Sequence, residues 1–162
     1  MNRRFFLRTA AALGLAGAVA ACQPMAGEPD IVDVAASNDQ FSTLVAAVSA
    51  AGLVDTLKGP GPFTVFAPTN AAFDALPAGT VDSLLLPENR DQLVAILTYH
   101  VVPGAITSDQ LAGQRLDVAT VNGATVHING THGVRVNSST VTTADIMASN
   151  GVIHVIDRVL LP

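Results

Sequence analysis

The chain has 162 residues, of which 49% are hydrophobic and 13% are charged, and this length and composition fit one globular domain with a sizeable core. Eight basic residues against 13 acidic ones give a formal net charge of −5. The basic residues beyond position 8 are scattered singly, so the chain offers no positive stripe for phosphate groups. This pattern argues against nucleic acid as a partner.

The first 22 residues predict export. Arginines at positions 3, 4 and 8 precede an uncharged run over 10–21, whose 12 residues are fewer than the roughly 20 of a membrane-spanning helix. Arg3 and Arg4 resemble a twin-arginine export signal, and the Val-Ala-Ala before Cys22 resembles a bacterial lipoprotein cleavage box. We expect lipid on Cys22, the only cysteine. An ordinary secretory signal and an unmodified Cys22 are the simpler alternatives.

These features divide the chain into three parts. Residues 1–21 are the expected signal peptide, 22–29 the lipidated cysteine with a short tether containing Pro and Gly, and 30–162 the domain. Cleavage would remove three of the eight basic residues and none of the acidic ones, which leaves a formal charge of 5 − 13 = −8. Because no basic amphipathic helix is present, membrane attachment would depend on the acyl chains at Cys22.

The domain opens with a helical pattern over 30–58. Phe41, Leu44 and Val48 fall on one apolar stripe, at the spacing expected for a helix that packs on a core. Asn38 suits a helix N-cap and Gly52 suits a helix terminator.

A corner follows at residues 63–76. Phe63–Phe66 favours a strand, and Pro68 ends it because proline cannot donate a ladder hydrogen bond and pushes the preceding residue into an extended conformation. Thr69 suits an N-cap, after which Phe73 and Leu76 are spaced as on one helical face. The stretch therefore predicts a strand-to-helix turn.

Two more helices are expected at 80–86 and 88–98, the second with Leu93, Ile96 and Leu97 on its inner face. After His100 the hydrophobic period becomes two. Turn signals at Pro103-Gly104, Asn122-Gly123, Asn129-Gly130 and Asn137-Ser138 are typical of hairpins. Helices that precede strands indicate an α+β fold.

Three stretches together resemble the signature segments of the fasciclin-like domain family: residues 64–76, 97–104 and 148–162. The resemblance covers essentially all of 30–162. It implies a wedge-shaped β-sandwich with a packed layer of N-terminal helices. It also implies a protein that binds other proteins at cell surfaces or in extracellular matrix, and no catalytic activity is general to the family.

The resemblance also singles out particular residues. Tyr99 and His100 match a Tyr-His pair that is implicated in adhesion in some animal members, which makes them candidate interaction residues. Asp157 and Arg158 match an acidic and a usually basic position of the last segment. Adjacent strand residues point to opposite faces, so we expect different partners for these two side chains.

The four histidines admit structural readings. His100 has bulky neighbours, which favours a buried, hydrogen-bonded role over a recognition role. His154 lies between Val152 and Ile156 at the period-two spacing of a strand, so we expect it in the sheet. His127 and His132 would face each other if Asn129-Gly130 formed a two-residue turn; a longer loop would pair Ile128 with Val134 and leave His132 at a tip. Two histidines without a third ligand are weak evidence for a metal.

No motif for catalysis, phosphate binding, metal binding or a cofactor is present, and we expect no enzyme. Two Asn-X-Ser/Thr sequences, at Asn129 and Asn137, are simpler as turns. The sequence thus predicts a non-enzymatic envelope module that binds an unidentified protein or matrix polymer. The alternative is a small-molecule carrier or hydrolase with a pocket between helices and sandwich.

Overall fold

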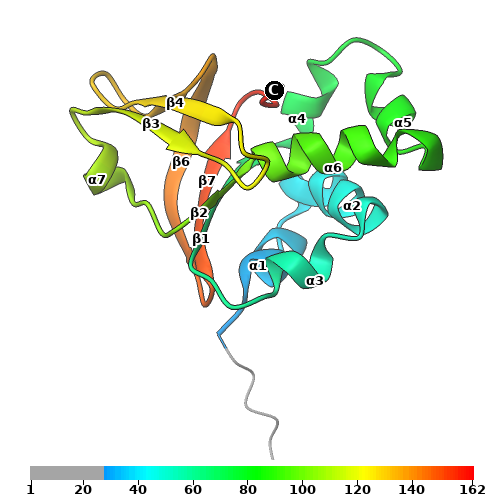
Figure 1. The fold of residues 1–162 in the computed structure, drawn as a ribbon, viewed down its shortest axis with the longest axis horizontal. Helices are drawn as coiled ribbons and strands as arrows, with labels where there is room; N and C mark the ends of the chain where they lie inside the picture. Colours follow the sequence, from blue (N-terminus) through cyan, green and yellow to red (C-terminus); the bar gives the residue numbers. More distant parts are fainter. Residues whose placement is uncertain (1–27) are drawn as a thin grey trace, which may run out of the picture.

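The computed structural model describes residues 28–162 (Figure 1). Helices gather on one side of the molecule and strands on the other, and the chain enters the domain at the end where the strands β1, β6 and β7 and the helix α1 meet. The predicted signal at 1–21, with Arg3 and Arg4, and the predicted lipidation at Cys22 lie outside the described residues. Within 28–162, no helix has the length and apolar character that crossing a bilayer requires.

The predicted helical stretch 30–58 is a series of short helices. Asn38 caps as expected, since its side chain accepts a hydrogen bond from Gln40 N at 3.0 Å. Gly52 ends the longest helix in the left-handed conformation, with φ of 72°, where glycine has no steric cost. The elements are α1 (Ile31–Ala36), η1 (Asp39–Phe41), α2 (Ser42–Ala51) and α3 (Val54–Leu57).

The corner forms as predicted, with a strand that is two residues longer than the expected Phe63–Phe66. Strand β1 (Phe63–Pro68) extends through the proline, because the missing donor falls on the last strand residue. Thr69 then caps α4 (Asn70–Asp74): its hydroxyl accepts from Ala72 N at 3.4 Å. Phe73 is buried in the core beneath this turn.

The two further helices are present with shifted ends. α5 (Thr80–Leu84) is followed by η2 (Pro87–Asn89) and α6 (Arg90–Tyr99). Leu93 and Leu97 are buried on the inner face of α6, whereas Ile96 is half-buried.

The strands form one hydrogen-bonded sheet in the order β2-β1-β7-β6-β5-β4-β3. Only the β1–β7 pair is parallel. β6 belongs to two ladders, because its first two residues pair with β5 and the remainder pairs with β7 past two register shifts. The helix α7 (Ser108–Leu111) was not predicted. The strands are β2 (Val101–Pro103), β3 (Arg115–Ala119), β4 (Thr125–Asn129), β5 (Arg135–Val136), β6 (Ser139–Ala148) and β7 (Gly151–Ile156).

The hairpin predictions had mixed outcomes. Turns at Asn122-Gly123 and Asn137-Ser138 connect neighbouring strands as expected. The two-residue turn at Asn129-Gly130 is wrong, and so is the Ile128–Val134 pairing of the longer loop, because Ile128 pairs with Val136. A Cβ on Gly130 would lie 1.8 Å from Leu111 O, so this loop packs tightly on α7. The connection between β4 and β5 is thus longer than two residues and spans 130–134.

Two clusters of buried residues make the interior. The helix-side core lies between the helices and β1 and β7, and includes Phe41, Leu97 and Ile153. The sheet-side core joins residues from both parts of the sheet, including Phe66, Ile128 and Ile156. The α+β prediction is confirmed, with helices covering one part of a folded sheet (Figure 1).

Candidate functional site: the Tyr99–His100 junction

Tyr99 connects the end of α6 to the sheet. Its side chain is 5% exposed and packs in the sheet-side core. The hydroxyl donates to Thr125 O at 3.2 Å and accepts from Asn137 Nδ2 at 3.0 Å. The Asn137 carboxamide oxygen in turn accepts from His127 N at 2.9 Å. Tyr99 therefore links α6 to β4 and to the β5–β6 turn.

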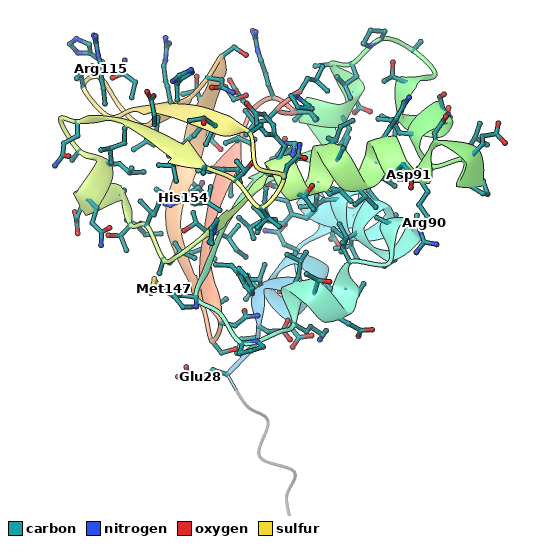
Figure 2. All side chains as sticks on the ribbon, viewed as in Figure 1. Glu28, Arg90, Asp91, Arg115, Met147 and His154 are labelled. Carbon is teal, nitrogen blue, oxygen red and sulfur yellow. The ribbon has the colours of Figure 1, made fainter. Side chains whose placement is uncertain are left out.

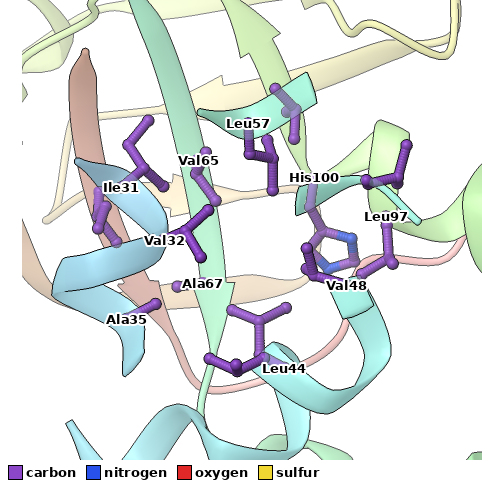
Figure 3. A pocket seen from close by; sticks show the side chains of 14 residues that line it. Ile31, Val32, Ala35, Leu44, Val48, Leu57, Val65, Ala67, Leu97 and His100 are labelled. Carbon is purple, nitrogen blue, oxygen red and sulfur yellow. The ribbon is translucent and has the colours of Figure 1, made fainter. Parts of the chain in front are cut away.

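His100 points into the other core. Its ring is 2% exposed and lies among apolar side chains of the helix-side core (Figure 3). Nε2 accepts from Leu160 N at 2.9 Å, so the ring proton is on Nδ1, which donates to Ile96 O at 2.8 Å. His100 thereby attaches the C-terminal segment to the last turn of α6.

Burial sets the charge state of His100. Desolvation lowers the pKa of the imidazole to about 4, although the hydrogen bond with the Ile96 carbonyl opposes this shift. The ring is therefore neutral at physiological pH. A neutral ring is what the two hydrogen bonds require, since Nε2 must accept.

Tyr99 and His100 are adjacent in the sequence, but their side chains point into different cores. Both are buried, so the interpretation of His100 as a hydrogen-bonded core histidine agrees with its position. A direct contact of either side chain with a partner stays a prediction.

A small cavity lies beside His100. Its volume is about 40 Å³, and its lining is apolar apart from the His100 ring, with Val48, Val65 and Leu97 among the neighbours (Figure 3). Sites for small molecules usually have roughly 300–1,000 Å³ and several converging polar groups. Both ring nitrogens of His100 already have partners. This cavity therefore gives no support to a carrier or hydrolase function.

The sequence analysis missed a polar cluster in which the partly buried Ser108 and Asp145 lie beside the buried His154. The Asp145 carboxylate accepts from Ser108 N at 2.7 Å and also from the Ser108 hydroxyl. These bonds lower the pKa of Asp145 below its usual range. His154 Nδ1 accepts from Asp145 N at 3.4 Å, and Nε2 donates to Ile106 O at 2.8 Å.

This cluster contains the residue types of a hydrolytic triad in another arrangement. In a triad a histidine accepts the serine proton, whereas here Ser108 bonds to the carboxylate and His154 bonds to backbone groups. Asp145 has φ of 57°, at the irregular part of β6. The cluster holds α7 and its preceding loop against β6 and β7. No local motif could have revealed it, since Ser108 and Asp145 are 37 residues apart.

The other two histidines lie apart on the surface. His127 Nδ1 contacts the Asp117 carboxylate across the β3–β4 ladder, with both side chains exposed. His132 lies in the β4–β5 loop. Within residues 28–162, no group of three or more His, Cys, Asp and Glu side chains is placed to hold a metal ion.

Asp157 and Arg158 have different surroundings, as their adjacent positions implied. Asp157 Oδ1 accepts from Thr140 N at 2.7 Å. Arg158 contributes its carbonyl to Ser139 Oγ at 3.1 Å, and its side chain borders an open depression beside α4. The carboxamide of Asn137 bonds to the Tyr99 hydroxyl and the His127 amide, which fits its turn role.

Comparison with known proteins places this geometry in a family. The family model described as Fasciclin domain matches residues 39–162. Protein sll1483 of Synechocystis sp. is 64% identical over 133 residues, which cover 82% of this chain and 73% of that protein. Cell surface glycolipoprotein MPB83 of Mycobacterium bovis is 38% identical over 144 residues, covering 85% of this chain and 62% of that protein.

A solved structure shares the fold. The FAS1 domain pair from the insect cell adhesion molecule Fasciclin I aligns with a TM-score of 0.62 at 21% identity, covering 76% of this chain and 46% of that chain. The match over 39–162 includes the helix-covered sheet and the buried Tyr99–His100 junction described above. The chain belongs to the fasciclin domain family.

Proposed function

We propose that the protein is an exported, membrane-anchored envelope protein whose fasciclin domain binds another protein or an extracellular matrix polymer, without catalysis. The observation that carries this proposal is the family match over 39–162, together with the relative that is described as a cell surface glycolipoprotein. Adhesion is the proposed role of the binding.

The interior supports a binding role for the outer surface. Among the described residues, every buried side-chain nitrogen and oxygen has a hydrogen-bond partner. His100, His154 and Ser108 are each committed to contacts that hold elements together. Their polar groups are therefore not available to a substrate. What the domain offers a partner is its exterior, formed by short helices on one side and strand faces on the other.

The proposed anchor is a lipid on Cys22. The cleavage box before this cysteine and the glycolipoprotein relative support it. We expect Cys22→Ala to move the protein from the membrane fraction to the soluble fraction of fractionated cells. Unchanged fractionation would refute lipidation. Replacing Arg3 and Arg4 together by lysine tests the export route, because a twin-arginine pathway should then leave the precursor uncleaved.

The binding proposal is tested by affinity capture. Purified full-length protein is incubated with envelope protein extracts and with extracted matrix polysaccharide, and Cys22→Ala serves as the control for adherence through lipid. A partner that both forms retain reproducibly supports binding by the domain. Retention of no protein and no polysaccharide by either form would contradict the proposal.

A further inference from the structure

An open groove lies where the chain enters the domain. It has a volume of about 470 Å³ and lies between the loop before β1 and the β6–β7 turn. We call it the tether-side groove. It is lined by Pro60, Gly61, Pro62, Ala105, Met147, Ala148, Ser149, Asn150, Gly151 and Val152.

The rim of the tether-side groove is apolar and exposed. Met147 is 65% exposed, which is more than any other large hydrophobic side chain of residues 28–162. Pro60 and Pro62 are exposed on the same groove. Figure 2 shows Met147 at the end of the molecule where Glu28 begins the described chain. Exposed apolar groups that lie together on a surface are typical of sites that contact a partner or a membrane.

Hydrogen bonds fix the start of the chain beside this groove. Ser149 N donates to Pro29 O at 3.0 Å, and Ile31 N donates to Asn150 Oδ1 at 3.0 Å. The Asn150 amide also donates to Leu57 O at 2.6 Å. The groove and the first residues of the domain therefore form one unit, whose orientation follows from where the chain is attached.

Five residues, 23–27, separate Cys22 from Glu28. A fully extended chain of this length spans at most about 20 Å between the two Cα atoms. We propose that the tether-side groove rests on the lipid bilayer to which Cys22 is attached, with Met147 and the two prolines at the interface. This inference rests on the proposed lipid anchor.

Because the domain is attached to the membrane, even a weak contact between the groove and the lipid is sufficient for docking. Three apolar side chains would hardly retain a free protein on a membrane. A short tether raises the local concentration of the domain to roughly the millimolar range, so that a weak contact becomes populated. Docking would leave α5 and the β4–β5 loop facing away from the lipid, toward partners.

Local charge predicts a lipid preference. Lys58 Nζ lies 3.1 Å from Asp30 Oδ2 and 2.9 Å from Asp33 Oδ1. With the exposed Glu28, these groups sum to 1 − 3 = −2. Uncharged lipid should therefore be preferred to anionic lipid, which would repel this end.

The test uses the lipidated full chain, which has no tryptophan. Met147→Trp places a single fluorophore on the groove, Pro60→Trp places one on the opposite rim, and Leu86→Trp is the control on a distant exposed site. Each protein is reconstituted in phosphatidylcholine vesicles with brominated acyl chains. We expect the two groove reporters to be blue-shifted and quenched several-fold more than the control, and less so when half the lipid is phosphatidylglycerol.

Each outcome decides the proposal. Docking is overturned if all three tryptophans are quenched equally. It is also overturned if none is quenched although the protein floats with the vesicles, a result that leaves the anchor in place. Failure to float overturns the anchor and the docking with it. Unquenched reporters combined with loss of a captured envelope protein in Met147→Gln would assign the groove to a protein partner instead. Glu28→Gln should strengthen quenching on anionic vesicles; no change would contradict the charge argument.

Discussion

The two cores of the domain are closed in different ways, although adjacent residues connect to them. The helix-side core is covered by short helices and retains a cavity of about 40 Å³ beside His100. The sheet-side core is enclosed by hydrogen-bonded strands, and Tyr99 reaches β4 and the β5–β6 turn through its hydroxyl. Adjacent residues at the end of α6 thus point into different cores, and each makes its own hydrogen bonds: Tyr99 to the strand region, and His100 to the C-terminal segment.

Removing the His100 side chain should cause the largest loss of stability. His100→Ala leaves the Leu160 amide without its buried acceptor and enlarges the neighbouring cavity, so we expect a loss of about 3–5 kcal/mol in the free energy of unfolding. Urea denaturation of the domain measures it. The exposed His127→Ala is the control and should change stability by less than about 0.5 kcal/mol. Equal stability of the two variants would contradict a structural role for His100.

The charge state of His100 predicts a pH dependence. Its pKa is lowered to about 4 in the folded domain, below the 6.5 of an unperturbed histidine. The unfolded chain therefore binds more protons between these values, and stability falls as pH decreases. This residue alone should remove about 3 kcal/mol between pH 7 and pH 4. His100→Asn should flatten that part of the profile, and an identical profile in the variant would count against a buried neutral ring.

Removing only the Tyr99 hydroxyl should have a smaller effect. Tyr99→Phe keeps the ring in the sheet-side core and loses the bonds to Thr125 O and Asn137 Nδ2, at a cost of about 1–2 kcal/mol. Asn137 is exposed and can bond to water instead, which limits the loss. Thermal unfolding measures this change. A loss as large as that of His100→Ala would contradict the smaller contribution assigned to the hydroxyl.

The smallest expected effect is a gain. Val48 lines the cavity, so Val48→Ile should fill part of it and stabilise the domain by up to about 1 kcal/mol. Val126 is fully buried in the sheet-side core, outside that cavity, and Val126→Ile should destabilise by about 1–3 kcal/mol through overpacking. Calorimetry on both variants tests the contrast. Changes of the same sign would contradict the difference in packing.

Local chemistry explains what the sequence could predict. The caps at Asn38 and Thr69 and the terminator Gly52 depend on neighbours within a few residues, so their patterns were readable. The close approach of Gly130 to Leu111 beside the β4–β5 loop is a contact between distant residues, which no turn dipeptide reveals. Likewise, burial of His100 was readable from bulky neighbours, whereas its bond to Leu160 spans 60 residues.

Amide hydrogen exchange at Leu160 tests the junction most directly. His100 Nε2 accepts the Leu160 amide, whereas no hydrogen bond joins Tyr99 to the C-terminal segment within the described chain. The two variants are compared under conditions that give them the same free energy of unfolding. The Leu160 amide should then exchange at least tenfold faster in His100→Asn than in Tyr99→Phe. Equal protection of Leu160 in both variants would contradict the claim that His100, and not Tyr99, holds the C-terminal segment to α6.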